Sequence, residues 1–249
     1  EAERKFLCED CEPDLVIQVE VGELPRPEVT RQLFSCDTWR LYETPRGCLL
    51  ALVSRRTGME PYRLIALERE GSEATLYVQE DLATIGCWVA VPGTFVSFEH
   101  PSMELITYWR LAQEGGLGLH AAGVVTDGEG VLFSGVSGAG KSTISELWMS
   151  EGATVLSDDR IGIRPDGDGY RMYGTPWHGT LRVCDPGTAP LRAIFFIEHG
   201  QSNEAERMDE ATACATSIAR AFPPYFSAED MSLALEAAAG IVAAVPCYA

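Results

Sequence analysis

The residues with the clearest chemical potential lie between positions 135 and 143, where glycines and small residues precede a lysine. The segment matches the pattern GxxxxGK[ST] and reads Gly135, Val136, Ser137, Gly138, Ala139, Gly140, Lys141, Ser142 and Thr143. Because glycine adopts backbone torsions closed to other residues, the N–H groups of such a segment can turn inward around a polyphosphate. Lys141 can then reach the outer phosphates, and the Ser142 hydroxyl can bind Mg²⁺.

The residues on either side of this phosphate-binding loop predict the strand and the helix that the pattern requires. Residues 130–134 have the composition of a short buried strand, and residues 144–148 continue into a helix whose positive N-terminal end would face the phosphates. Lys5 and Lys141 are the two lysines of the chain, so composition alone does not account for a lysine at this position. We expect a bound nucleotide rather than a glycine-rich turn that ends in Lys-Ser by chance.

Two neighbouring carboxylates follow the next apolar strand. Asp158 and Asp159 come directly after the expected strand 153–157. At that end of a nucleotide-binding sheet, one carboxylate can hold Mg²⁺ and the other can orient or deprotonate an attacking hydroxyl. On a continuous strand the two side chains would point to opposite faces, so both reach one site only if a turn begins there. The alternative is a solvated turn in a protein rich in acidic residues.

His120 is a third candidate. It lies on the expected strand 119–125, and a hairpin turn at Asp127-Gly128 would return the chain beside the phosphate-binding loop. Taken alone, a histidine on an apolar strand is more often a core residue than a catalytic one. Its role therefore depends on the pattern around it.

Composition bounds the class of partner. The net charge of −18 opposes binding to nucleic acid and to anionic membranes, although acidity can also serve solubility alone.

The eight cysteines are dispersed, so free thiols are expected, and Cys8-x-x-Cys11 lacks the second close pair that structural zinc would need. With no apolar run long enough to span a bilayer and no leader at its start, the chain is expected to be a soluble cytoplasmic protein.

Period-two apolar patterns and turn residues predict a β-rich lobe over residues 1–115. The first strand should be half-buried, and the next four should pair as two hairpins. The expected strands of this lobe span residues 15–21, 39–42, 48–53, 62–67, 74–78 and 89–98.

Residues 116–249 predict an α/β lobe, which a helix over residues 102–113 precedes. After Asp159, residues 160–165 and 169–173 alternate around a turn, which indicates a β-ribbon where an ordinary mononucleotide-binding fold has a helix. The other expected elements are strands 119–125, 131–133, 153–157, 191–197 and 240–245, and helices 144–148, 204–221 and 227–239.

Three segments together resemble the C-terminal kinase domain of the HPr kinase/phosphorylase family. They are Leu119-His120-Ala121, the phosphate-binding loop, and Val155-Leu156-Ser157-Asp158-Asp159-Arg160, and their spacing matches that family. The resemblance covers residues 117–165 and implies a mixed-sheet core related to ATP-dependent phosphoenolpyruvate carboxykinase. It also implies the site roles: Lys141 on the phosphates, Ser142 on Mg²⁺, Asp158 as the base facing the acceptor hydroxyl, Asp159 near the metal, and His120 supporting Asp158.

Residues 173–180 depart from that family and are instead typical of HPr-kinase-like proteins found beside peptide-modifying enzymes. Within this segment Trp177 and His178 either line the acceptor or nucleotide pocket or form a packed turn. Further on, Arg182 is a candidate to balance phosphate charge, and Glu198 is a candidate to bind metal through water.

The resulting expectation is an ATP- and Mg²⁺-dependent kinase that transfers a γ-phosphoryl group to a serine-type hydroxyl on a peptide or small protein. Two alternatives stay open. One is a kinase of a small hydroxyl metabolite, against which the β-ribbon argues. The other is a nucleotide-binding regulator or scaffold without transfer activity. A homo-oligomer is compatible with each of the three.

Overall fold

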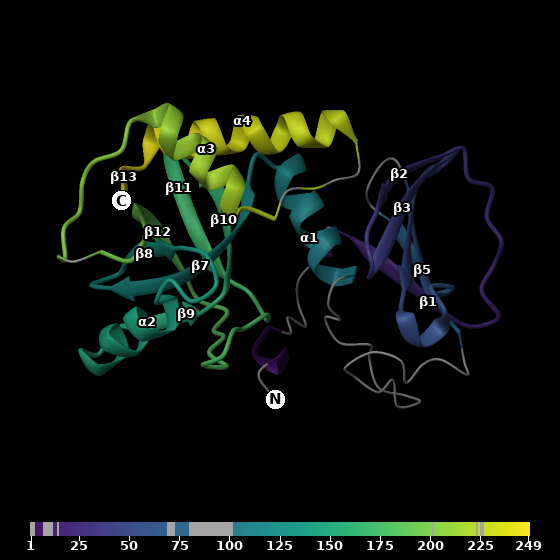
Figure 1. Ribbon diagram of the computed structural model, residues 1–249, viewed down its shortest axis with the longest axis horizontal. Coiled ribbons are helices and arrows are strands. Elements are labelled where there is room, and N and C mark those ends of the chain that lie inside the picture. The colour runs from purple at the N-terminus through teal and green to yellow at the C-terminus, as the bar shows by residue number, and fades with distance from the viewer. Residues whose placement is uncertain are drawn as a thin grey trace. The chain divides into compact units, whose positions relative to one another are not determined.

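The computed structural model describes residues 3–6, 12–13, 15–68, 73–79, 102–200, 202–222, 224 and 227–249 of a mixed α/β protein (Figure 1). Its internal contacts divide the chain into two units. The smaller unit holds Cys8–Ile106 with Tyr225–Ser227, and the larger holds Glu1–Leu7, Thr107–Pro224 and Ala228–Ala249. The boundary thus falls inside the helix α1 (Ser102–Gln113) rather than after residue 115.

The smaller unit contains a six-stranded mixed sheet with the order β1-β6-β5-β4-β3-β2. Only the β1–β6 pair of this sheet is parallel. Both expected hairpins are confirmed as β3–β4 and β5–β6, whereas the expected strand 89–98 lies outside the described residues. The strands are β1 (Val16–Gly22), β2 (Arg31–Ser35), β3 (Trp39–Thr44), β4 (Gly47–Val53), β5 (Pro61–Glu68) and β6 (Glu73–Gln79), and a short 3-10 helix spans Arg55–Thr57. A second short 3-10 helix, Glu3–Phe6, belongs to the larger unit.

The central strands of this sheet are buried on both faces, and β1 is not. Leu50 and Ile65 are fully buried, whereas Val19 and Val21 are 48% and 65% exposed. The expectation that β1 is half-buried is therefore wrong. Alternation in the sequence marks a strand, but β1 is an edge strand, and its apolar side chains lack cover.

Five strands of the larger unit close into a barrel. They pair in the cyclic order β7-β8-β12-β11-β10, because β10 pairs with β7 as well as with β11. Two further strands join from outside, β9 beside β7 and β13 beside β12. The strands are β7 (Leu117–Thr126), β8 (Glu129–Ser134), β9 (Thr154–Ser157), β10 (Arg160–Asp166), β11 (Gly169–Gly174), β12 (Thr188–Phe196) and β13 (Cys247–Tyr248).

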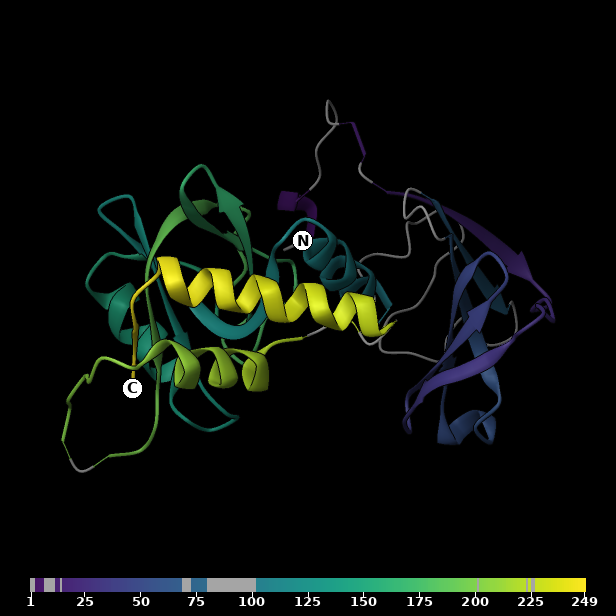
Figure 2. The same ribbon diagram turned by 90° about the horizontal axis from the view of Figure 1, so that it is seen from above.

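Helices cover two sides of these strands (Figures 1 and 2). On one side α2 (Lys141–Ser150) packs Ile144 and Trp148 against Phe133 and Val155. On the other side α3 (Glu210–Arg220) and α4 (Ala228–Ala244) lie side by side over a core that reaches into the barrel. None of the helices in the described ranges is long and apolar enough to cross a membrane.

Two local features matter for the site. Asp127 and Gly128 have φ values of 51° and 77°, which builds the tight hairpin that returns β8 beside β7, as expected. The expected β-ribbon is also confirmed as β10 and β11. The expected strand 240–245 is wrong, because α4 continues to Ala244. Ile241 and Val242 lie on α4 and are buried in the hydrophobic core of the larger unit, so tertiary packing overrides their preference for a strand.

Candidate functional site

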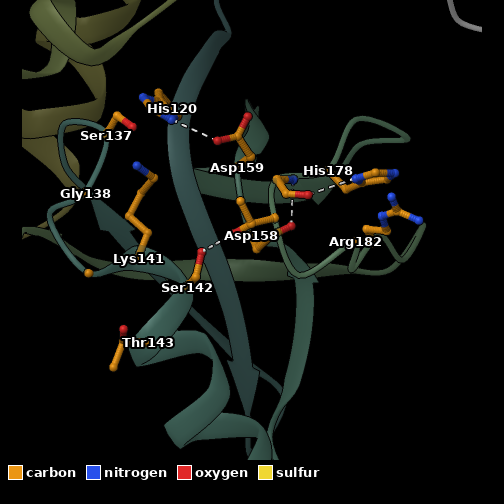
Figure 3. A pocket seen from close by; sticks show the side chains of 13 residues that line it. His120, Ser137, Gly138, Lys141, Ser142, Thr143, Asp158, Asp159, His178 and Arg182 are labelled. Atoms are coloured by element: carbon orange, nitrogen blue, oxygen red, sulfur yellow. Dashed lines mark hydrogen bonds and ion pairs between the residues drawn. The ribbon is translucent and has the colours of Figure 1, made fainter. Parts of the chain in front are cut away.

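A cavity of about 780 Å³ opens where β8 and β9 end. The phosphate-binding loop and the start of α2 form one wall, and Asp158 and Asp159 form the opposite wall (Figure 3). His120 enters from β7, and His178 and Arg182 enter from the segment between β11 and β12. The residues that the sequence singled out from three separate segments thus meet in one place.

Glycine is required at several points of the loop. Gly138 and Gly140 have φ values of 83° and 107°, which other residues rarely adopt. At Gly135 a Cβ atom would lie 2.9 Å from both Ala139 Cβ and Ile197 Cγ1. Gly140 caps α2 without a side-chain hydrogen bond, so the first N–H groups of the helix keep their capacity for an anion.

Lys141 lines the cavity and is 7% exposed. Its ammonium donates to the carbonyl oxygens of Gly135 at 2.9 Å and Val136 at 3.3 Å, which leaves one of its three protons for a ligand. Burial lowers the pKa of Lys141, and the charge of Arg220 lowers it further, while Asp159 and Asp158 raise it.

The strand β9 stops at Ser157, and the side chain of this serine builds the turn that follows. Ser157 Oγ accepts hydrogen bonds from the N–H groups of Asp159 at 3.2 Å and Arg160 at 3.1 Å, and it donates to the Trp177 carbonyl at 3.0 Å. Because the turn begins here, neighbouring carboxylates that a strand would direct apart both line the cavity.

Asp158 is held by backbone amides. It is 2% exposed, Oδ1 accepts from the Gly179 N–H at 2.8 Å, and Oδ2 accepts from the Leu181 N–H at 2.9 Å. Each of its oxygens thus fixes one side of residue 180. Asp158 anchors the segment between β11 and β12 to the end of β9.

Asp159 is the partner of His120. Its Oδ1 lies 2.9 Å from His120 Nε2, and its Oδ2 forms an ion pair with Arg160. Burial alone would raise the pKa of Asp159, but the hydrogen bond from His120 and the charges of Arg160 and Lys141 outweigh it, so the pKa is lowered. The carboxylate is therefore ionised at neutral pH.

The pairing of His120 differs from the one that the resemblance implied, because His120 contacts Asp159 and not Asp158. The backbone explains the difference. The Asp159 carbonyl accepts from the Ala121 N–H at 3.0 Å, which places Asp159 beside the strand that carries His120. His120 is 26% exposed and lines the cavity, so it is not a core residue.

Of the four secondary candidates from the sequence, two line the cavity and two do not. His178 and Arg182 line the cavity, whereas Trp177 is buried and its ring packs 5.8 Å from that of Tyr108. Glu198 is exposed and is not among the lining residues.

Sequence reasoning missed three residues of this region. Thr180 lines the cavity with its hydroxyl 3.1 Å from Ser142 Oγ. His199 Nε2 lies 3.2 Å from the Gly138 carbonyl, and Arg220 acts on Lys141 through its charge. His199 and Arg220 belong to no motif, and Thr180 ends the segment 173–180, in which the sequence assigned it no role.

The donor set fits magnesium only together with phosphates. The described residues contain no group of three or more His, Cys, Asp or Glu side chains that could hold a metal by themselves, and Cys8 and Cys11 lie outside them. Mg²⁺ commonly binds one or two protein oxygens and completes its shell with phosphate oxygens and water. Ser142 at the mouth of the loop suits that mode.

Comparison with known families gives one match. The model of the SynChlorMet cassette protein ScmC matches residues 96–249. The chain belongs to this ScmC family. The matched region includes the phosphate-binding loop, His120, both aspartates and the segment 178–182. No curated protein matches the chain.

Proposed function

We propose that this ScmC-family chain is an ATP- and Mg²⁺-dependent kinase with an HPr kinase/phosphoenolpyruvate carboxykinase-like core. It transfers the γ-phosphoryl group of ATP to a serine-type hydroxyl on a peptide or small protein. One observation carries the proposal: Lys141, Ser142 and the His120–Asp159 pair line a single cavity of about 780 Å³.

The donor side of the cavity suits a polyphosphate. The loop offers backbone N–H groups and the N-terminal end of α2, and Lys141 offers a fixed positive charge near the outer phosphates. Bound Mg²⁺ would neutralise charge on the β- and γ-phosphates, with Ser142 as one of its ligands. Most of the rate then comes from positioning and electrostatic stabilisation.

The acceptor side suits proton removal by Asp159 rather than by Asp158. Both oxygens of Asp158 accept backbone N–H groups, and this carboxylate is almost fully buried. Asp159 is more exposed, with 21% of its side chain accessible, and His120 orients it. As the acceptor oxygen bonds to the γ-phosphorus, the bond from that phosphorus to the bridging oxygen breaks and ADP leaves. The acceptor proton passes to Asp159 late in the transfer.

The peptide acceptor rests on the segment after β11. Residues 173–180 are typical of HPr-kinase-like proteins found beside peptide-modifying enzymes, and His178 and Arg182 of this region are exposed at the cavity. The ribbon of β10 and β11 that follows Asp159 argues against an ordinary small-metabolite kinase.

The test is to incubate the protein with γ-labelled ATP and Mg²⁺ and to offer peptide mixtures and metabolite pools separately. We expect label on peptide. Label on a metabolite instead would establish the small-molecule alternative, and label retained in ATP despite tight nucleotide binding would establish a regulator.

A pair of matched variants tests the base. Asp159→Asn should abolish transfer while the variant still gains thermal stability from MgATP, because the loop that binds the phosphates is untouched. Asp168→Asn, an exposed change in the β10–β11 turn, should behave like the native protein. Full transfer by Asp159→Asn would remove Asp159 from the mechanism.

A further inference from the structure

The hydroxyl groups of Ser142 and Thr180 meet across the cavity. Ser142 Oγ lies 3.1 Å from Thr180 Oγ1, although the two residues come from α2 and from the segment between β11 and β12. Ser142 is the hydroxyl that the phosphate-binding motif offers to a metal. A second hydroxyl therefore lies beside an expected metal ligand.

The backbone holds Thr180 in this place. The N–H groups of Gly179 and Leu181, on either side of it, both donate to the buried carboxylate of Asp158. The Arg182 N–H donates to the Gly179 carbonyl at 3.3 Å and closes the turn. The hydroxyl of an exposed threonine would ordinarily be mobile, but here its backbone is fixed from both sides.

The spacing of the two oxygens fits magnesium. Mg²⁺ binds six oxygens in near-octahedral geometry at about 2.0–2.1 Å, so neighbouring ligand oxygens lie about 2.9 Å apart. The hydrogen bond of 3.1 Å thus keeps the two oxygens close to the separation that two adjacent Mg²⁺ ligands need.

We propose that Thr180 is a second protein ligand of the nucleotide-bound Mg²⁺, next to Ser142. The proposal rests on the proposed function, because the metal arrives with the nucleotide. It assigns Asp158 the part of a positioning residue, which places Thr180 without touching the metal. It also agrees with the contacts of Asp158, since both oxygens of this buried carboxylate already accept backbone N–H groups.

One consequence concerns the order of binding. A metal held by Thr180 fastens the segment that also carries His178 and Arg182 to the start of α2. The acceptor side of the cavity is then completed only when the Mg²⁺-nucleotide is present. The nucleotide should therefore bind before the acceptor.

The experiment measures binding, not activity. Fluorescently labelled ADP is titrated into the native protein and into Thr180→Val, Thr180→Ser, Ser142→Ala and Thr126→Val, with Mg²⁺ and with EDTA. Loss of a residue that only hydrogen-bonds to a metal ligand commonly lowers metal affinity 10- to 100-fold. Loss of a direct ligand should cost at least as much, so we expect Thr180→Val to weaken Mg²⁺-dependent binding at least about tenfold. Thr180→Ser should retain it, and Thr126→Val, at the far end of β7, should leave it unchanged.

A metal swap identifies direct ligation. Thiolate ligands favour soft metals, so Thr180→Cys should bind ADP more tightly with Cd²⁺ than the native protein does. The paramagnetic resonance spectrum of Mn²⁺-ADP should also change in Thr180→Val. Neither readout would respond if Thr180 only stabilised the fold.

The outcomes separate this proposal from the proposed function. If Ser142→Ala weakens Mg²⁺-dependent binding and Thr180→Val does not, Thr180 is no ligand and the kinase proposal stands. If the native protein binds ADP equally with Mg²⁺ and with EDTA, or not at all, the proposed function itself fails. Should Thr180→Val lower the melting temperature, a Cd²⁺ preference no greater in Thr180→Cys than in the native protein would still overturn the proposal.

Discussion

The variant Asp158→Asn tests whether Asp158 positions the segment 179–181 or acts as the catalytic base. In the native protein Oδ1 accepts from the Gly179 N–H at 2.8 Å and Oδ2 from the Leu181 N–H at 2.9 Å. Asparagine has nearly the same shape but only one acceptor oxygen, because the other group becomes an NH₂ donor. One of the two backbone N–H groups would then face another donor in a buried site.

The magnitude follows from these two hydrogen bonds. A hydrogen bond to a charged group contributes about 1.5–3 kcal/mol, and a buried donor without a partner costs about 1–3 kcal/mol. Because removal of a buried charge recovers part of this, we expect the segment 179–181 to be destabilised by about 2–4 kcal/mol. Domains are stable by about 5–15 kcal/mol, so the segment should detach while the unit stays folded.

The assay is hydrogen exchange at single amides. A change of 1.36 kcal/mol is tenfold, so the protection of the Gly179 and Leu181 amides should fall about 30- to 900-fold in Asp158→Asn. Asp159→Asn is the matched control and should leave both amides protected, since its partners are His120 and Arg160. Unchanged protection in Asp158→Asn would refute the anchor, and with it the argument that Asp158 is unavailable as the base.

Three further predictions concern the fold and the site. A Cβ at Gly179 would lie 2.7 Å from Asp158 Oδ2, so Gly179→Ala should weaken Mg²⁺-nucleotide binding in a fluorescence titration. Gly169→Ala should not, because a Cβ there would lie at an ordinary contact distance of 3.9 Å from the Asp166 carbonyl oxygen. Because burial lowers the pKa of Lys141 and phosphate binding needs its ammonium form, nucleotide affinity should be lost as the pH rises through a value below the ordinary 10.5; a flat profile up to 10.5 would contradict this. Ile163 is fully buried in the core of the barrel, so Ile163→Ala should cost about 2–5 kcal/mol in urea unfolding, and a cost below 1 kcal/mol would argue against a closed barrel.

Local sequence patterns predicted most helices and strands, but they did not predict which strands distant in the sequence pair with each other. The helix α1, both hairpins of the smaller unit and the ribbon of β10 and β11 follow from apolar periodicity and turn residues, and the structure confirms them. The closure of the barrel depends on the register between Arg160 and His120, which lie far apart in the sequence. No periodicity encodes such a pairing. For the same reason residues 240–245 were mistaken for a strand, since only the packing of α4 decides their state.

The candidate site shows the same division. Motif and spacing predicted which segments meet, and they do meet in one cavity. They did not predict which aspartate faces His120, because that depends on the turn built by Ser157 and on the backbone hydrogen bond between Asp159 and Ala121. The segment 173–180 was singled out, but the place of Thr180 beside Ser142 was not predicted, because hydrogen bonds from its neighbours to Asp158 set its position.

The contacts of the two aspartates also explain how an acidic protein can bind a highly charged anion. The chain carries a net charge of −18, and unscreened carboxylates in the cavity would repel a triphosphate. Asp158 is met by two amide dipoles, and Asp159 is met by His120 and by the guanidinium of Arg160. The negative charges that the chemistry requires are thus balanced within the protein. Lys141 and the N-terminal end of α2 therefore keep their positive potential for the phosphates. Arg160→Met would leave the charge of Asp159 without its guanidinium partner, and this charge would repel a bound nucleotide. The variant should therefore bind ATP less well, and by a larger factor than ADP, although Arg160 is not among the residues that line the cavity.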